Sequence, residues 1–241
     1  MNSYSFIFIS LLAGVIAGLI LAGVNYFVAE PYIDQAIGIE IENTIAAGET
    51  VDFNELNTYR VWQKEGTFVA GAFLGVTNGA ILGIVYVIAR KYLPSSDDRK
   101  KALILAGLIC LALYVVPFLK YPANPPAVGD PETIGLRESL YTSFQLISGL
   151  IVLGLSVLLI KFKSVNNFKY LIPVFYVGLI GFIYSIFPAN PDAITAPMDL
   201  VNSFRIATFT TMVMFYIVLG IIFGMMWRKY RPHETTRLTA S

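Results

Sequence analysis

Residues 66–89 read GTFVAGAFLGVTNGAILGIVYVIA and contain no charged side chain. A helix needs about 20 apolar residues to cross the roughly 30 Å hydrocarbon core of a bilayer, so this stretch is long enough to span a membrane. Five further uncharged stretches occur at residues 1–29, 102–119, 139–160, 170–191 and 206–227. The sequence therefore predicts an all-α integral membrane protein with six transmembrane helices.

The expected helices account for nearly the whole chain. Their predicted positions are about 6–29, 67–89, 102–119, 140–160, 170–187 and 206–227, followed by a tail at 228–241. With 241 residues, 56% of them hydrophobic, and a mean hydropathy of +0.67, no length remains for a soluble domain of ordinary size. We expect a single membrane domain over residues 1–241.

Charged residues divide unevenly between the connections. Twelve of the 17 Lys and Arg residues lie in the second connection, the fourth connection and the tail, whereas 13 of the 16 Asp and Glu residues lie in the other three connections. The positive-inside rule then predicts three hairpins whose loops face outward, with both termini in the cytoplasm, in the plasma membrane. The acidic outer loops would raise the local concentration of cations.

Glycine recurs at every fourth position of the second stretch. Gly71, Gly75, Gly79 and Gly83 form one nearly continuous stripe along which another helix backbone can approach closely. We predict that this stripe packs helices together, and a role in lining or gating a pore is the alternative.

A tetrad repeats after the third and fifth predicted helices. Residues 122–125 and residues 188–191 both read Pro-Ala-Asn-Pro, and each follows an aromatic residue. Proline ends a helix and biases the residue before it towards extended geometry, so each tetrad fixes how the chain leaves the membrane. The residues of these segments with a predicted structural or gating role are Lys120, Asn124, Arg137, Asn190 and Arg205.

Enzyme signatures do not occur in the sequence. It has no Gly-rich phosphate loop with a lysine, no cysteine pair for zinc and no Gly-x-Ser-x-Gly elbow, and its one histidine, His233, lies in the tail beside charged residues. We therefore expect neither catalysis, nor a resident cofactor, nor a nucleic-acid partner.

Carboxylates are the remaining candidates for a metal site. The candidate ligands are two acidic pairs in the outer segments, Glu30 with Asp34 and Asp130 with Glu132. Oxygen ligands suit hard or borderline cations, but without imidazole or thiolate they discriminate transition metals poorly. The alternative is that arginines, Arg137 and Arg205 among them, neutralise some of these carboxylates in structural ion pairs.

Three segments of the chain read EPYIDQAI at 30–37, PFLKYPANPPAVGDPETIG at 117–135 and FRIA at 204–207. Together they resemble the CbtA family of probable cobalt transporter subunits. The resemblance implies a multi-span membrane protein assigned to cobalt uptake and often paired with a small single-span second subunit, CbtB. Family members often carry histidine in the first outer loop, whereas residues 38–65 of this chain contain none.

Two functions fit these observations. The first is a divalent-cation transport subunit, with cobalt or nickel as its substrate and the acidic outer loops as its mouth. The second is a non-transporting structural or accessory subunit that packs through its glycine stripes into a larger membrane complex. The expected partners are the bilayer and either a CbtB-like chain or other membrane subunits.

Overall fold

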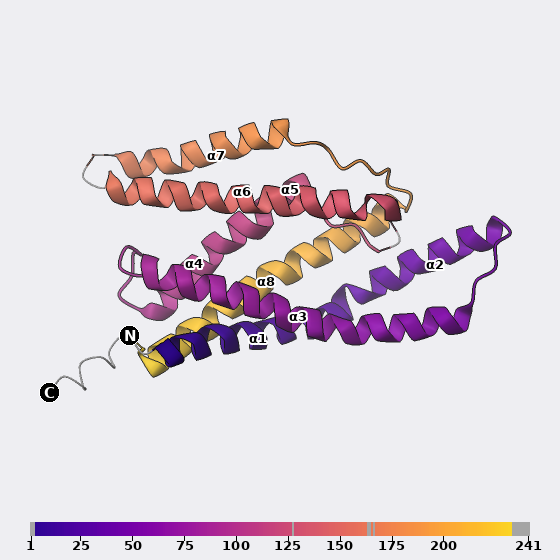
Figure 1. Ribbon diagram of the computed structural model, residues 1–241, viewed down its shortest axis with the longest axis horizontal. Helices are drawn as coiled ribbons and strands as arrows, with labels where there is room; N and C mark the ends of the chain where they lie inside the picture. The colour runs from indigo at the N-terminus through magenta and orange to yellow at the C-terminus, as the bar shows by residue number, and fades with distance from the viewer. Residues whose placement is uncertain (1–2, 127, 163–164, 166, 233–241) are drawn as a thin grey trace. The chain divides into compact units, whose positions relative to one another are not determined.

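The computed structural model describes residues 3–126, 128–162, 165 and 167–232. Within these residues the regular structure is helical, and six helical segments are long and apolar enough to cross a membrane. The segments are α1 Ser3–Val28, α3 Phe53–Ala89, α4 Asp98–Cys110 continued by η1 Leu111–Val115 and α5 Val116–Lys120, α6 Ile134–Lys161, α7 Phe168–Ile186, and α8 Met198–Tyr230 (Figure 1). The predicted all-α class with six spans is confirmed, whereas the side on which the loops and termini lie stays a prediction.

The segment between the first two spans is more helical than its polarity suggests. A further helix, α2 Glu30–Ala46, follows α1, and α3 begins at Phe53, well before the predicted start at residue 67. Asp52 caps α3, because its Oδ1 accepts hydrogen bonds from the backbone N–H groups of Asn54 at 2.9 Å and Glu55 at 3.1 Å. The apolar run of the sequence indicates only the part of α3 that can lie in lipid. The helix itself extends beyond that run, to its cap at Asp52.

Contacts group the chain into two compact units. The first contains residues 1–108, 125–127 and 198–241, which hold α1, α2, α3, most of α4, and α8. The second contains residues 109–124 and 128–197, which hold η1, α5, the short 3-10 turn η2 Pro131–Thr133, α6 and α7.

Glycines bring α1 and α3 together in the first unit. A Cβ atom placed on Gly75 would lie 2.1 Å from the carbonyl oxygen of Gly14, and one on Gly71 would lie 2.7 Å from that of Gly18. Gly79 faces the backbone of Ser10 in the same way. Two helix backbones can approach this closely only where side chains are missing from both of them.

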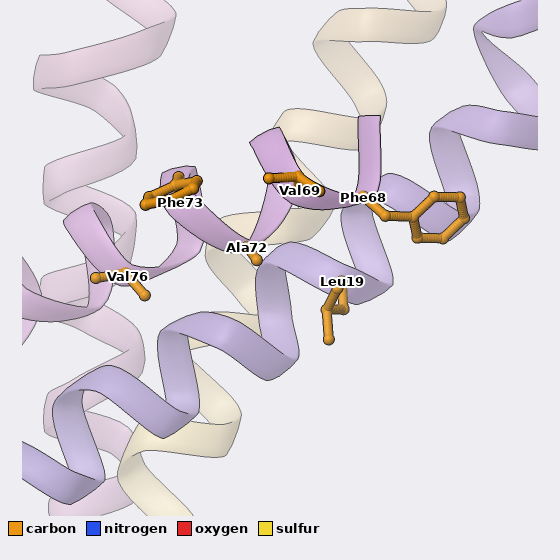
Figure 2. A pocket seen from close by; sticks show the side chains of 6 residues that line it. All are labelled: Leu19, Phe68, Val69, Ala72, Phe73 and Val76. Carbon is orange, nitrogen blue, oxygen red and sulfur yellow. The ribbon is translucent and has the colours of Figure 1, made fainter. Parts of the chain in front are cut away.

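Beside this contact, α1 and α3 enclose a shallow apolar crevice (Figure 2). Its lining comes from one residue of α1 and one stretch of α3, namely Leu19, Phe68, Val69, Ala72, Phe73 and Val76. No lining side chain is polar, so the crevice offers no ligand to a cation.

Aromatic side chains fill the core where α8 crosses this unit. Phe215, Phe223 and Trp227 are fully buried, and the ring of Tyr86 from α3 packs edge-on against Phe223 and Trp227. The hydroxyl of Tyr216 donates a buried hydrogen bond of 2.9 Å to Asn78 Oδ1 on α3. The polar Asn78 side chain is therefore satisfied between two helices.

In the second unit, a proline inside the third span is compensated by a side chain of α6. Pro117 lacks the N–H that would bond to the carbonyl of Leu113, four residues earlier, and a π-helical turn precedes it. The Nε2 group of Gln145 donates to that carbonyl at 2.6 Å. Gln145 thus supplies a hydrogen bond that lipid could not provide.

Candidate functional site

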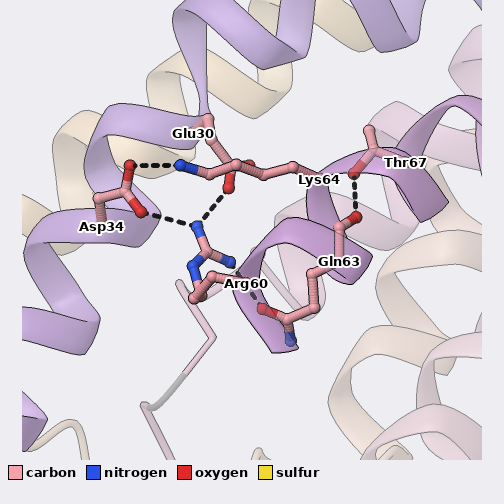
Figure 3. Close-up of polar contacts among 6 residues, drawn as sticks. All are labelled: Glu30, Asp34, Arg60, Gln63, Lys64 and Thr67. Carbon is pink, nitrogen blue, oxygen red and sulfur yellow. Dashed lines mark hydrogen bonds and ion pairs between the residues drawn. The ribbon is translucent and has the colours of Figure 1, made fainter. Parts of the chain in front are cut away.

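The first predicted carboxylate pair lies at the start of α2 and faces α3. Arg60 Nη2 forms an ion pair with Glu30 Oε1 and contacts Asp34 Oδ1 at 2.8 Å, while Lys64 Nζ contacts Asp34 Oδ2 at 3.0 Å (Figure 3). Glu30 and Asp34 are four residues apart, and so are Arg60 and Lys64. Each pair therefore lies on one face of its helix. The two helices therefore present matching charges to each other.

The side chains of this ion-pair network differ in burial. The Glu30 and Arg60 side chains are 11% and 12% exposed, whereas Asp34 is 50% exposed. Partial burial alone would raise the pKa of Asp34, but hydrogen bonds from Arg60 and Lys64 outweigh it and hold that pKa below its ordinary value of 3.8. Gln63 Oε1 accepts a further hydrogen bond of 2.7 Å from Arg60 Nη1, which orients the guanidinium (Figure 3).

The network changes what the Glu30 and Asp34 pair can do chemically. A divalent cation at these oxygens would have to displace a guanidinium and an ammonium that are already bound. Sequence reasoning did not identify Arg60 and Lys64 as partners of this pair. The sequence signal that could have identified them is their four-residue spacing, which equals the spacing of Glu30 and Asp34.

The second predicted pair organises the turn before α6. Asp130 Oδ1 accepts a hydrogen bond of 2.9 Å from the backbone N–H of Glu132, so this carboxylate caps the turn η2. The Glu132 side chain is exposed. A metal-ligand role for Asp130 and Glu132 stays a prediction.

Asp192 holds this turn, and sequence reasoning missed it. Its side chain is 4% exposed and accepts hydrogen bonds from the Thr133 hydroxyl at 2.7 Å and the Asp130 backbone N–H at 3.1 Å. Arg137 Nε lies 3.0 Å from Asp192 Oδ2, an ion pair whose Nε–H is not well aligned for a hydrogen bond. Arg137 thus forms a structural ion pair with a carboxylate, as the alternative to a metal site predicted. Its partner is Asp192, which is not one of the candidate ligands.

Gly129 leaves room for this arrangement. Its φ angle is +106°, a conformation that favours glycine, and a Cβ atom there would lie 2.5 Å from Asp192 Oδ2. The same Cβ atom would lie 2.8 Å from Nη1 of the Arg137 guanidinium. The Gly129-Asp130 step is therefore part of the carboxylate-binding turn.

Within the second unit, the residues before the first tetrad contact the end of α7 and the start of the second tetrad. The Tyr121 hydroxyl, just before the first tetrad, donates to the Pro188 carbonyl of the second at 2.6 Å. Lys120 Nζ donates to the Tyr184 carbonyl at 2.9 Å and lies 4.4 Å from the Tyr184 ring centroid. Asn190 Oδ1 accepts from the Asp192 backbone N–H at 3.1 Å.

The other two residues with a predicted structural or gating role lie on different segments of the chain. Asn124 lies in the connection that follows α5, in the second unit, and Arg205 lies on α8 in the first. Their predicted roles stay predictions.

Among residues 3–126, 128–162, 165 and 167–232, no three or more His, Cys, Asp or Glu side chains come together in a group that could hold a metal ion. The carboxylates seen here act in pairs or singly, and each pair has partners within the protein. What the site offers chemically is oxygen ligands and a negative potential.

Six long apolar helices, with acids and bases gathered near their ends, define a multi-pass membrane protein. The family model described as probable cobalt transporter subunit (CbtA) matches residues 3–228, so the chain belongs to the CbtA family. A search of the curated proteins gave no match, and a search of the solved structures gave none either. The family description is that of a transporter subunit rather than an enzyme.

Proposed function

We propose that this chain is a cobalt-transport subunit of the plasma membrane whose acidic outer arm collects the cation. The family match over residues 3–228 supports the transport assignment. The arm consists of α2, the connection at residues 47–52 and the first part of α3, residues 53–65. Cobalt is the substrate in this proposal, and nickel is the second cation to test.

The observation that carries the proposal is the charge of the outer part of this arm. Residues 35–59 contain five acids and no Lys or Arg, and all five are exposed: Glu40, Glu42, Glu49, Asp52 and Glu55. The two bases of the arm, Arg60 and Lys64, are already engaged by Glu30 and Asp34. An uncompensated negative surface raises the local concentration of cations and speeds their encounter with the protein.

Cobalt accumulation in cells tests this proposal. Cells lacking the gene receive either the wild-type chain or a variant with Glu40, Glu42, Glu49 and Glu55 changed to Gln. At limiting cobalt and low ionic strength we expect uptake by the variant to fall several-fold, and the difference to shrink at high salt because salt screens exposed charges. Changing Asn43 and Asn57 to Gln in the same arm leaves the charge unaltered and is the matched control.

Two results would count against different parts of the proposal. Equal uptake by the wild type and the four-site variant at low ionic strength, with equal protein abundance, removes the cation-collecting role. Equal cobalt content in cells with and without the gene removes the transport role itself.

A second candidate is an accessory subunit that does not itself conduct the metal. It is favoured by the ion pairs that occupy Glu30 and Asp34, and by the lack of a metal-binding group among the described residues. The family description as a subunit implies a partner chain, for which a small single-span CbtB-like protein is our proposal. Cobalt flux into vesicles holding the purified chain alone, compared with the chain plus its partner, separates the two candidates.

A further inference from the structure

Basic side chains from three helices gather at one end of the first unit. The end of α3, the start of α4 and the end of α8 lie at the same end of this unit (Figure 1). We define the basic surface as the five residues there that have no ion pair to a carboxylate among the described residues, namely Lys91, Lys100, Lys101, Arg228 and Lys229.

Partly buried contacts hold these three helix ends together. The Tyr86 hydroxyl of α3 donates to Asp98 Oδ1 of α4 at 2.7 Å, and Arg90 Nη2 lies 3.1 Å from the same oxygen. The Arg90 guanidinium also sits 5.6 Å from the ring centroid of Trp227, which is fully buried on α8. These contacts fix the spacing of the helices whose ends carry the basic surface.

α4 and α8 are in direct backbone contact at this place. A Cβ atom on Gly224 would lie 2.8 Å from Arg99 Cα. Hydrogen bonds from Arg99 lower the pKa of the Asp97 carboxyl, and the charge of Arg228 adds to this effect. Among the described residues, the two acids of this region, Asp97 and Asp98, form their ion pairs with Arg99 and Arg90, and the five residues of the basic surface form none with a carboxylate.

Tyrosines flank this surface, as is typical of residues at the level of the lipid headgroups. Lys91 Nζ lies 4.9 Å from the ring centroid of Tyr92, and Lys229 Nζ lies 5.5 Å from that of Tyr230. Both rings are about half exposed. Tyrosine is enriched at the membrane–water interface, and lysines near helix ends extend their charge towards the headgroups.

We propose that the basic surface binds the phosphate headgroup of an anionic phospholipid. A lipid phosphate brings negative charge to the depth at which the tyrosines lie, and several basic residues from separate helices can surround one headgroup. Juxtamembrane bases attract anionic lipid in this way, with a contribution of about 1 kcal/mol for each Lys or Arg.

Native mass spectrometry of the full chain, titrated with phosphatidylglycerol or phosphatidylcholine, tests the proposal. We expect the wild type to retain phosphatidylglycerol preferentially. The double change Lys100→Gln with Lys229→Gln should weaken that binding about thirtyfold, the factor that corresponds to about 2 kcal/mol for two basic residues. Lys161→Gln with Lys169→Gln removes the same charge from the second unit and should leave the affinity within twofold.

Further measurements separate the other outcomes. Lys100→Arg with Lys229→Arg keeps both charges and should keep the affinity, which guards against a folding defect in the glutamine variant. The proposal is overturned if both lipids bind equally, if the control pair weakens binding as much, or if inorganic phosphate displaces phosphatidylglycerol and stabilises the protein equally.

Discussion

Replacing Gly75 with alanine tests the contact between α1 and α3 most directly. The new Cβ atom would lie 2.1 Å from the carbonyl oxygen and 2.7 Å from the carbonyl carbon of Gly14, whereas ordinary contacts begin at 3.4 Å. Both obstacles are backbone atoms, so no side chain can rotate away. The two helices must therefore separate by more than about 1 Å, which weakens the packing along the whole glycine stripe.

The size of the effect follows from a comparison with Gly178→Ala on α7. A Cβ atom on Gly178 meets nothing within 4 Å. Both changes exchange glycine for alanine inside a helix and gain about 1 kcal/mol of helix propensity, which cancels between them. Overpacking of a tight core costs about 1–3 kcal/mol, and we expect the upper end because a backbone has to move.

Equilibrium unfolding in mixed detergent, followed by far-ultraviolet circular dichroism, measures the difference. We expect the free energy of unfolding of Gly75→Ala to be about 3 kcal/mol below that of Gly178→Ala. Equal values for the two variants would refute the close approach of α1 and α3, and leucine at both positions should widen the gap.

Three further outcomes follow from the polar contacts. Arg60→Gln leaves the nearly buried Glu30 carboxylate without its ion pair, so the free energy of unfolding should drop by about 3 kcal/mol, and an unchanged value would exclude the network. Because the folded-state pKa of Asp34 lies below 3.8, its stabilisation is complete above that pH and is lost as the pH falls through the folded value; acid titration of Asp34→Asn should lack this loss. Gly129→Ala should lower the free energy of unfolding by about 1–2 kcal/mol, because the φ angle there is positive and the new Cβ atom meets the Asp192 carboxylate. Faster proteolysis of the turn before α6 in this variant would detect the change.

The spans were predictable because the signal for them is local. Hydropathy and the lack of charge add up along a single helix, so residues 66–89 could be recognised as a span without any knowledge of their neighbours. The start of α3 at Phe53 was missed for the same reason. The Asp52 cap and the polar first turns belong to a helix that leaves the bilayer, where hydropathy carries no information.

The partners of the candidate carboxylates were not predictable in this way. Glu30 and Asp34 could be chosen by charge and spacing, but their pairing with Arg60 depends on how α2 and α3 are rotated towards each other. Asp192 lies 62 residues from Asp130 and gives no local sign that it holds that turn. In each case the same carboxylate could serve as a metal ligand or as an ion-pair partner.

The sequence by itself determined the class of protein, the six spans and the glycine stripe, because each depends on residues within one helix. Only the tertiary structure decided which charges neutralise one another and which remain exposed. Ion pairs form over a few ångströms between segments far apart in the chain, and their formation depends on helix rotation and register. The acids of residues 35–59 are left uncompensated because the nearest bases are turned towards Glu30 and Asp34.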